Sequence, residues 1–385
     1  MESRFIEKLL KNREIEFKSL GDVTEMKRGK TITAKDASGG DIPVISGGQK
    51  PAYYHNEYNR NGKTITVAGS GAYAGFIMYW EEPIFVSDAF SIKSDETLLD
   101  LKYVYHFLLQ HQQKIYGMKK GSGVPHVYPK DLSTLVIPIP PLDVQQEIVR
   151  ILDAFTSLTA ELTAELTSRQ KQYQYFRDKL LNFDDISDRG GYETNSITKA
   201  LLHNKKVVFK ALGNISENLD FMRKPITSGL REKGNIPYYG ASGIVDYVKD
   251  YIFEGDYLLV SEDGANLLAR NTPIAFSISG KNWVNNHAHV LKFNTYTERR
   301  FVEFYLNNID LTPYISGASQ PKLNKNNLSN IKIPAPPFEE QQRIVTILDK
   351  FETLTNSIAE GLPKEIELRR KQYEYYREKL LSFSQ

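Results

Sequence analysis

The sequence predicts an α+β protein in which two globular halves of mainly antiparallel strands are separated by two long helices. One long stretch carries most of this prediction. It begins IPIPPLDVQQEIVRILDAF at Ile137 and closes on RQKQYQYFRDKLLNF at Phe183. It occurs again from Ile333 as IPAPPFEEQQRIVTILDKF, closing on RRKQYEYYREKLLSF. The segment before each copy holds short apolar runs broken by Gly, Ser and Asn, a pattern typical of strands and turns. Self-similarity of this length indicates two related halves.

The repeated stretch has the apolar spacing of a long helix with one narrow apolar face. In the first copy, Ile148, Phe155 and Leu162 lie on one seven-residue repeat, and the stripe drifts slowly as its period departs from 3.5. Pro140-Pro141 prevents the helix from extending backwards, and Asp143 is a first-turn acid that suits the helix dipole. About 40 helical residues span roughly 60 Å. A helix of this length and polarity needs a partner.

We therefore expect the helices at 141–183 and 337–385 to pack on each other as an antiparallel intramolecular coiled coil. The alternative is two unrelated amphipathic helices, each packed on its own domain. Matched residues are 196 positions apart near the helix starts and 200 apart near the ends, so the second copy is about one turn longer. Gly361-Leu362-Pro363 falls in this insertion and predicts a kink or short break.

The two globular segments also match each other, although more loosely than the helices do. The predicted boundaries are a leader helix at 1–14, a first globular domain at 15–140, a linker at 184–206 and a second globular domain at 207–336. One helix is expected near the end of each domain, at Leu101–Tyr116 and Glu298–Asn308. The matching segments are Phe17–Val23 with Phe209–Ile215, Ile42–Gly48 with Ile236–Gly243, Thr64–Gly71 with Tyr257–Gly264, and Gly121–Pro125 with Gly317–Pro321.

Composition restricts the class of protein. The net charge of +2 is near neutral, so DNA binding by this chain has to rest on local patches or on partner subunits. The absence of cysteine excludes disulfides and thiolate zinc sites. The charged start has no apolar core for a signal peptide, and no run approaches the roughly 18 apolar residues of a membrane span. We expect a soluble, cytoplasmic protein with no membrane association.

No motif in the sequence indicates catalysis. Gly29-Lys30-Thr31 and Gly62-Lys63-Thr64 lack the earlier glycine of a phosphate-binding loop. Pro336-Pro337-Phe338 resembles the catalytic tetrapeptide of amino-methyltransferases, but Ala335 precedes it and cannot accept the amino hydrogen bond. His287 and His289 suggest a metal only if acids join them, and no matching acid is evident in the sequence. We expect no catalytic residue, metal or cofactor in this chain.

Recognition is the remaining role, because DNA sequence is read by Arg, Lys, Asn, Gln and Ser on base edges while basic groups hold phosphates. Polar and basic residues in the turns of both halves are the candidate DNA contacts. In the first half they are Lys27, Arg28, Gln49, Lys50, Ser70, Tyr73, Lys119, Lys120, Ser122 and His126. In the second half they are Arg223, Lys224, Arg231, Ser242, Asn266, Arg270, Asn286, His287 and Lys322.

The repeated IP-x-PP…QQ-x-IV-x-IL-D followed by KQY…R-x-KLL, with G-[SA]-x-x-P before each copy, resembles the specificity subunit of type I restriction-modification systems. The resemblance covers nearly the whole chain. It implies two target-recognition domains on an antiparallel coiled coil, each domain reading one half of a bipartite, non-palindromic site in double-stranded DNA. It implies a subunit without catalytic activity. Because recognition domains of that family diverge with their targets, the DNA contacts named above remain inferences from residue type and position.

The same resemblance implies partners that carry the chemistry. Two methyltransferase subunits would bind S-adenosylmethionine and methylate adenine at N6, and restriction subunits would use ATP and Mg²⁺. The candidate partner-binding residues are Gln145, Gln146, Gln341 and Gln342 near the helix starts and Tyr173, Arg177, Tyr373 and Arg377 near the ends. Two other readings stay open: a coiled-coil adaptor that joins proteins, and a stand-alone methyltransferase or nuclease with unrecognised motifs.

Overall fold

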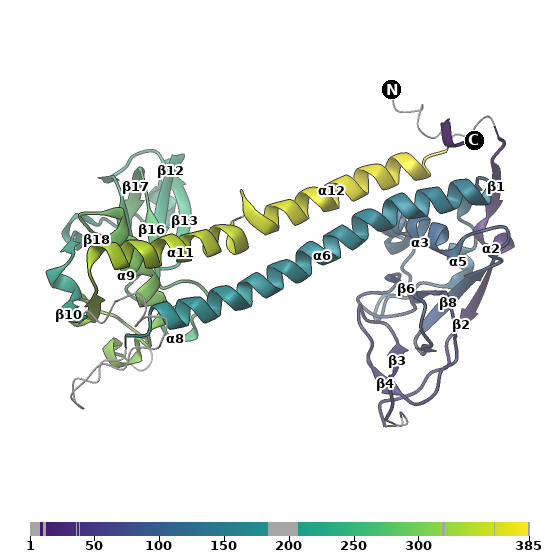
Figure 1. Cartoon of the computed structure of the whole chain (residues 1–385), viewed down its shortest axis with the longest axis horizontal. Coiled ribbons are helices and arrows are strands. Elements are labelled where there is room, and N and C mark those ends of the chain that lie inside the picture. The colour runs from purple at the N-terminus through teal and green to yellow at the C-terminus, as the bar shows by residue number, and fades with distance from the viewer. Residues whose placement is uncertain are drawn as a thin grey trace. The chain divides into compact units, whose positions relative to one another are not determined.

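The computed structural model describes residues 8–10, 13–35, 37, 39–183, 207–317, 320–357 and 359–383. The chain forms two compact units, one of residues 1–164 with 364–385 and one of residues 165–363 (Figure 1). Each unit therefore combines one globular half with helical residues from both copies of the repeat.

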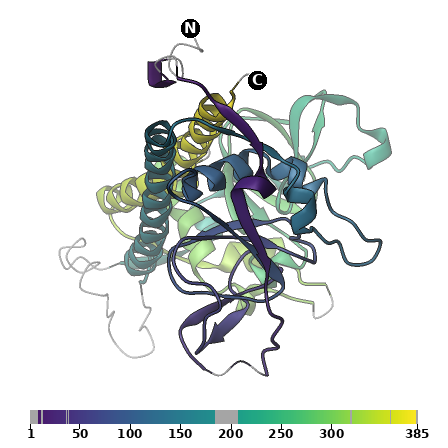
Figure 2. The same cartoon turned by 90° about the vertical axis from the view of Figure 1, so that its right-hand side faces the viewer.

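The globular part of the first unit is built on two small sheets (Figure 2). One has the strand order β2-β8-β5-β6 and is antiparallel throughout, and its inner strand β5 is buried at all five positions. The other has the order β4-β3-β7, in which β3 and β7 are parallel. A separate pair, β1 with β9, brings the start and the end of this half together. The strands are β1 Glu16–Ser19, β2 Thr24–Arg28, β3 Ile42–Ile45, β4 Tyr53–His55, β5 Thr64–Ala68, β6 Ile77–Trp80, β7 Phe85–Val86, β8 Ala89–Ser94 and β9 Val136–Ile139.

The expected helix over Leu101–Tyr116 forms as two helices. The first begins after Asp100, whose carboxylate accepts hydrogen bonds from the backbone N–H groups of Lys102 and Tyr103 and so caps the first turn. Its apolar face, including Val104 and Phe107, is buried against the sheet. The helices of this half are α2 Leu20–Val23, α3 Leu101–Gln110, α4 Gln112–Tyr116 and α5 Pro129–Leu132.

The second unit repeats this plan. Its first sheet has the order β11-β18-β15-β16, and its second has the order β13-β12-β17-β14, where β12 and β17 are the parallel pair. The pair β10 with β19 closes this half as β1 with β9 closes the other. The strands are β10 Val208–Ala211, β11 Glu217–Asn218, β12 Lys233–Gly240, β13 Gly243–Val248, β14 Phe253–Glu254, β15 Tyr257–Ser261, β16 Ala275–Ile278, β17 Lys281–Val284, β18 Ala288–Lys292 and β19 Lys332–Ala335. The helices are η2 Leu212–Asn214, η3 Asp220–Met222, η4 Ser228–Leu230, α8 Asn266–Ala269, α9 Tyr296–Asn308, η5 Thr312–Tyr314 and α10 Lys325–Asn330.

The first copy of the repeat forms one continuous helix, α6 Leu142–Leu180. The second copy forms two, α11 Phe338–Asn356 and α12 Gly361–Leu381, which confirms the predicted interruption. Gly361 has a φ of 78°, and a Cβ there would lie 2.4 Å from the carbonyl oxygen of Thr353. Only glycine fits this turn without strain.

Within each unit, the start of one copy packs on the end of the other. In the first unit, the rings of Phe155 and Tyr376 stack with centroids 5.1 Å apart. In the second unit, Phe351 stacks on Phe176 at 5.6 Å and on Tyr173 at 6.2 Å. A start that meets an end places the paired segments antiparallel. The predicted intramolecular antiparallel coiled coil is confirmed.

The helix segments also belong to the cores of the units, because their apolar residues are buried with those of the sheets. The two KLL motifs at the helix ends supply fully buried leucines. The first core contains Ile148, Leu152, Leu380 and Leu381, and the second contains Ile344, Leu348, Leu180 and Leu181.

Two matched residues fasten each helix start to its own domain. The first is the leading glutamine of each QQ motif. Gln145 is fully buried, and its amide donates to the carbonyl oxygens of Pro140 at 2.8 Å and Leu98 at 3.0 Å. Its side-chain oxygen accepts from the N–H of Asp100 at 2.8 Å. Gln341 makes the corresponding bond to the Pro336 carbonyl at 2.9 Å. The first N–H groups of each helix donate to the carbonyl of the following proline, Pro141 or Pro337, so the glutamine side chain supplies the donor for the carbonyl just before the helix.

The second is the aspartate of each ILD motif. Asp153 bonds to Lys102 at 2.8 Å and to His106 at 3.0 Å, both on α3. Burial raises the pKa of Asp153, but hydrogen bonds from His106 and Lys102 outweigh this and hold the pKa below its usual range. In the second unit Asp349 bonds to Arg300 and to the hydroxyl of Tyr296, both at 2.8 Å and both on α9.

The predicted linker at 184–206 lies outside the described residues, as does most of the leader helix. The described part of the leader, residues 8–10, is helical. Arg13 follows it and holds Asp143 with two hydrogen bonds of 2.7 and 2.9 Å, so the leader is joined to the first turn of α6.

We predict that the two neighbouring glutamines of the first QQ motif differ sharply in their effect on stability. Gln145→Leu leaves one N–H and two carbonyls without partners in the protein interior, and we expect a loss of about 2–3 kcal/mol. Gln146→Leu changes an exposed side chain and should stay within about 0.5 kcal/mol of wild type. Urea denaturation followed by Trp80 fluorescence in a Trp283→Phe background measures both. Equal effects of the two substitutions would contradict the internal role of Gln145.

Candidate nucleic-acid interface

The first half brings its candidate residues together at the end of strand β5. Ser70, just past the strand, forms an antiparallel β-bridge with His126. His126 also forms a β-bridge with Lys120, and the G-[SA]-x-x-P motif lies in the hairpin between these two residues. The Ser70 hydroxyl donates to the carboxylate of Asp88 in the β7–β8 turn. A Cβ on Gly47 would lie 2.5 Å from the Ser70 carbonyl oxygen, so the turn that carries Gln49 and Lys50 packs directly on this place.

Four segments thus meet in the first half, and we call them together the first reading surface: residues 46–50, 69–73, 87–88 and 120–128. Its aromatic part is ordered by stacking. The rings of His126 and Tyr128 stack at 5.9 Å, and the Arg28 guanidinium lies 5.4 Å from the Tyr128 ring centre. Arg28, Asp88 and His126 line a hollow between these segments. It presents donors, acceptors and a positive charge side by side.

The second half assembles the same four segments through the same backbone bonds. Leu323 N–H donates to the Glu262 carbonyl at 2.8 Å, as Val127 N–H donates to Gly69 at 3.0 Å. Glu262 N–H donates to the His287 carbonyl, as Gly69 N–H does to that of Asp88. We call the resulting set the second reading surface: residues 240–243, 262–266, 286–287 and 316–323, of which 318 and 319 lie outside the described residues.

The side chains on the two reading surfaces differ although their frames agree. Asp263 stands where the first half has Ser70, and it accepts from His287 at 2.9 Å. Lys322 takes the place of His126 and forms β-bridges with Asp263 and Ser316. Asp263 and His287 line a hollow with apolar walls. The two surfaces therefore share one backbone frame and differ in their exposed groups.

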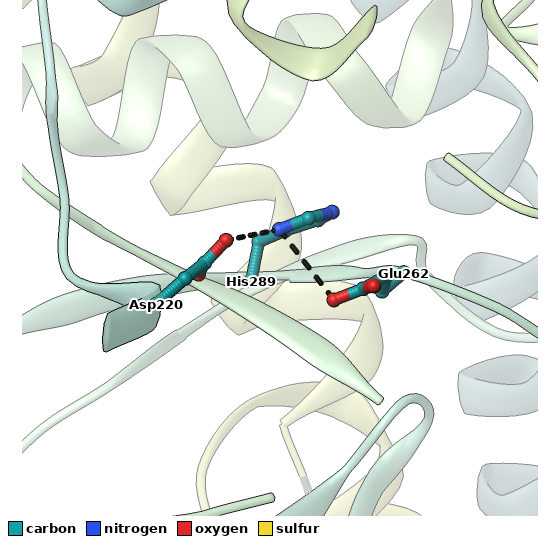
Figure 3. A group of neighbouring side chains, drawn as sticks. All are labelled: Asp220, Glu262 and His289. Carbon is teal, nitrogen blue, oxygen red and sulfur yellow. Dashed lines mark hydrogen bonds and ion pairs between the residues drawn. The ribbon is translucent and has the colours of Figure 1, made fainter. Parts of the chain in front are cut away.

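A buried ionic cluster lies beneath the second reading surface. Asp220, Glu262 and His289 face one another in the interior (Figure 3). His289 Nδ1 lies 2.6 Å from Asp220 and 3.8 Å from Glu262, and its Nε2 lies 2.6 Å from the carbonyl oxygen of Leu323. Arg223 and Lys322 reach Glu262 at 2.5 and 3.1 Å. The expectation that no acid accompanies His289 is therefore wrong: both acids come from segments distant in the sequence.

The described partners of this cluster are charged and polar groups of the domain itself. A carbonyl oxygen can only accept, so Nε2 of His289, which faces the carbonyl oxygen of Leu323, carries a hydrogen. Arg223 and Lys322 supply further positive charge to the same carboxylates. Burial raises the pKa of Asp220 and of Glu262, but bonds and charges from His289 and Arg223 outweigh it and hold both pKa values below the usual range.

Most predicted DNA contacts lie exposed on or beside the reading surfaces. In the first half Tyr73 is 47% exposed, while Lys119 and Lys120 bond to the Ala72 carbonyl at 3.0 Å and to Asp131 at 2.6 Å. The further candidates with exposed side chains are Lys27, Arg28, Gln49, Lys50 and Ser122 in the first half, and Lys224, Ser242, Asn286, His287 and Lys322 in the second. Of these, Lys322 also binds Glu262 of the buried cluster.

Four predicted contacts of the second half are partly buried, and their polar groups already form bonds inside the domain. Arg223 binds Glu262 and the Ala288 carbonyl, and only 13% of its side chain is exposed. Arg231 binds Asp246 and the Ile226 carbonyl. Asn266 closes its own turn on Thr272. Arg270 donates to the carbonyls of Asn307 and Ile309.

The predicted partner-binding residues divide in the same way. Gln145 and Gln341 cap the helix starts, so the prediction of a partner contact is corrected for Gln145, which is fully buried. Gln146 and Gln342 are exposed. Tyr173 and Tyr373 lie within the packing of the units, Tyr373 through a 3.0 Å bond to His106, and burial raises the pKa of Tyr173 to about 12. Arg177 and Arg377 cover the rings of these tyrosines at 5.8 and 5.0 Å.

The sequence reasoning missed several residues of this region. Asp88 and Tyr128 stand in the first reading surface, but neither is part of a repeated motif. Tyr175 and Tyr375 are equivalent positions two residues after the tyrosine of the KQY motif, and they are 53% and 49% exposed. The repeat itself contained the signal for these two tyrosines, since both copies keep them.

Comparison with known proteins agrees with this arrangement. The sequence profile of the family described as "Type I restriction modification DNA specificity domain" matches residues 12–169 and 204–368. A putative type I restriction enzyme specificity subunit from Haemophilus influenzae is 33% identical, over 99% of this chain and 98% of that protein. The EcoR124I/EcoR124II specificity subunit of Escherichia coli is 32% identical over 99% and 98%. The crystal structure of the S subunit from Mycoplasma genitalium matches with a TM-score of 0.66 and 20% identity, over 97% and 98% of the two chains, which shows a shared fold.

The chain therefore belongs to the family of type I restriction-modification DNA specificity proteins. It is a specificity subunit, so the prediction of a non-catalytic recognition role, instead of an enzyme, is confirmed by its relatives. Within the described ranges, every long helix is too polar to cross a lipid bilayer.

We predict that the buried cluster makes the stability of the second unit depend on pH. The pKa values of Asp220 and Glu262 are lower in the folded state than in the unfolded chain. Their stabilisation is therefore complete above the unfolded values of about 4 and is lost as the pH falls through the folded values. Urea denaturation of the second unit, followed by Trp283 fluorescence in a Trp80→Phe background, should show a falling midpoint below about pH 4.

Asp220→Asn should lower the midpoint at neutral pH and flatten its dependence on acid. Glu254→Gln, an exposed site on β14, is the matched control and should change neither quantity. A variant at Asp220 that keeps the full acid dependence would show that the cluster does not control it.

Proposed function

We propose that each globular half of this specificity subunit reads one half of a bipartite site in double-stranded DNA, through its own reading surface. The observation that carries the proposal is the repetition of one backbone frame with different exposed groups. Ser70, Asp88 and His126 in the first half are replaced by Asp263, His287 and Lys322 in the second. Base edges are distinguished by their pattern of donors and acceptors. Two surfaces with different patterns favour two different half-sites and so a non-palindromic target.

Charge is distributed as this proposal requires. The exposed cations Lys27, Arg28 and Lys50 in the first half, and Lys224 and Lys322 in the second, stand at or beside the reading surfaces. Such groups hold phosphates and fix the register, while neutral polar groups read bases. With a net charge of only +2, the chain alone should bind DNA weakly. Partner subunits are then expected to supply the remaining phosphate contacts.

We further propose that two methyltransferase subunits bind the helical segments, one on each unit. The first unit offers exposed Gln146 and Tyr375, and the second offers the equivalent pair Gln342 and Tyr175. Duplicated exposed residues suit two copies of one partner. These partners would hold S-adenosylmethionine and methylate adenine at N6, and restriction subunits using ATP and Mg²⁺ would join them. We propose a cytoplasmic location, because there the subunit would have access to chromosomal DNA.

We predict that substitutions on the two reading surfaces relax different half-sites. His126→Ala should reduce discrimination in the first half-site and His287→Ala in the second, each by roughly 5- to 100-fold at the base pair concerned. The assay uses the complex of this chain with its methyltransferase subunits. The target is first read from methylated adenines in cells, and methylation is then measured on DNA with each base pair replaced in turn.

The two variants serve as controls for each other, because each should keep the profile of the half-site that it does not read. Lys332→Ala, an exposed cation on β19, controls for loss of charge alone. If both histidine variants relax the same half-site, or if neither changes any position, the assignment of one reading surface to each half-site is overturned.

We also predict that the helical segments set the untouched gap between the half-sites. TAEL occurs twice in succession at 159–162 and 163–166, so a third unit extends α6 by about one turn, or roughly 6 Å. With four residues added at the matching level of the second copy, the gap should widen by about one to two base pairs. Both half-sites should stay unchanged. A methylation map with the original gap would exclude this role of the helices.

A further inference from the structure

Two large apolar side chains are displayed to solvent beside the second reading surface. Phe221 is 78% exposed and Met222 is 40% exposed, and both lie on the short helix η3. Single exposed apolar residues are common on protein surfaces, but an adjacent pair on a fixed turn is a less ordinary arrangement.

The turn that carries this pair is held on both sides by buried charges. Asp220 precedes it and binds His289 at 2.6 Å and the N–H of Val290 at 3.0 Å. Arg223 follows it and binds Glu262 at 2.5 Å and the Ala288 carbonyl at 2.8 Å. The buried ionic cluster therefore holds the turn with the apolar pair in place. Because both ends are fixed, the pair is exposed by the fold and not by fraying of a loop.

The matching segment of the first half, residues 28–30, is fully described and has no counterpart of this turn. Lys30 N–H donates to the Val86 carbonyl as Lys224 N–H donates to that of Val284. Arg28 pairs with Phe90 in the sheet, and Phe90 is equivalent to His289 of the second half. Since His289 is the partner of Asp220, Arg28 occupies the position equivalent to Asp220. One residue separates Arg28 from Lys30, whereas three residues separate Asp220 from Lys224. The second half thus contains two additional residues at this point.

The residue at this point in the first half is Gly29, and no side chain fits there. A Cβ on Gly29 would lie 2.1 Å from the carbonyl oxygen of Ser87. Its N–H donates to the Ala89 carbonyl, the bond that the Arg223 guanidinium makes to Ala288 in the second half. The apolar pair is therefore a feature of one half alone, built on the same frame.

The pair adjoins the groups that we assign to DNA reading. Arg223 donates to the carbonyl oxygens of Ala288 and Asn286, the two residues that flank His287. Lys224, the next residue, is exposed and cationic. The apolar pair thus borders His287 on one side and a phosphate-binding candidate on the other, which favours DNA over a protein partner as its occupant.

We propose that Phe221, supported by Met222, makes an apolar contact with a base of the second half-site. Aromatic and apolar side chains contact the thymine methyl group in the major groove or pack against the face of a base. The contact would give the second half-site a discrimination that the first half cannot make at the equivalent position, because Gly29 offers no side chain. This inference rests on the proposed reading of one half-site by each half of the chain.

The test compares Phe221→Ala with wild type in the complex with methyltransferase subunits. Binding is measured at stated salt on DNAs in which each base pair of both half-sites is replaced in turn. Phe221→Ala should weaken binding of the intact target roughly ten-fold or more. It should also abolish the discrimination at one or two adjacent positions of the second half-site, with the first half-site profile unchanged. Phe221→Tyr, which keeps the ring, should retain most of the effect.

Leu230→Ala is the matched control, because Leu230 is 76% exposed on another short helix, η4, of the same unit. It should change neither affinity nor the profile. Equal profiles for wild type and Phe221→Ala would overturn the proposal, as would failure of the variant to assemble with methyltransferase subunits before DNA is added. A wild-type profile without two separate half-sites would instead refute the underlying function, so the two failures are distinguishable.

Discussion

The constraint on which the structure depends is that each compact unit is completed by the far end of the other helical copy. The first core buries Leu380 and Leu381 beside Ile148 and Leu152. The second buries Leu180 and Leu181 beside Ile344 and Leu348. Fully burying one leucine contributes about 1.5–3 kcal/mol, so each exchanged pair is comparable with a large share of a domain's net stability. Neither globular half therefore has its whole core within its own sequence segment.

This exchange determines which parts of the sequence can differ between the two halves. The ends and starts of the helices, the QQ capping and the ILD aspartates have to match in both copies, since each serves a core or a helix start. The exposed side chains of the turns at the ends of β5 and β15 serve neither a core nor a helix start. Their backbone bonds are kept, as those of Gly69 and Glu262 illustrate, while the exposed groups at Ser70 and Asp263 differ. Recognition can diverge at these turns without cost to the frame.

The sequence predicted the features that periodicity and repetition encode: two long helices, their antiparallel packing and the break near Gly361. It could not separate Gln145 from Gln146, because adjacent residues of one type differ only in which way the helix turns them. It also gave no sign of the internal bonds of Arg223 or of the acids around His289. Asp220 and Glu262 are 69 and 27 positions from His289, and only the strand pairing of β11, β15 and β18 brings the three together.

The buried cluster of the second half shows how a shared frame is made to serve a different sequence. Buried charges give little net stability over apolar residues of similar volume, and the first half fills two of the same positions with Phe90 and Gly69. What the charges add is fixed geometry: each carboxylate has two or more partners, so the added turn at Phe221 has one available position. Directional bonds hold an inserted segment where apolar packing alone would let it shift. The second half therefore gains a new exposed surface while the ladder of β11, β18 and β15 stays as it is in the first.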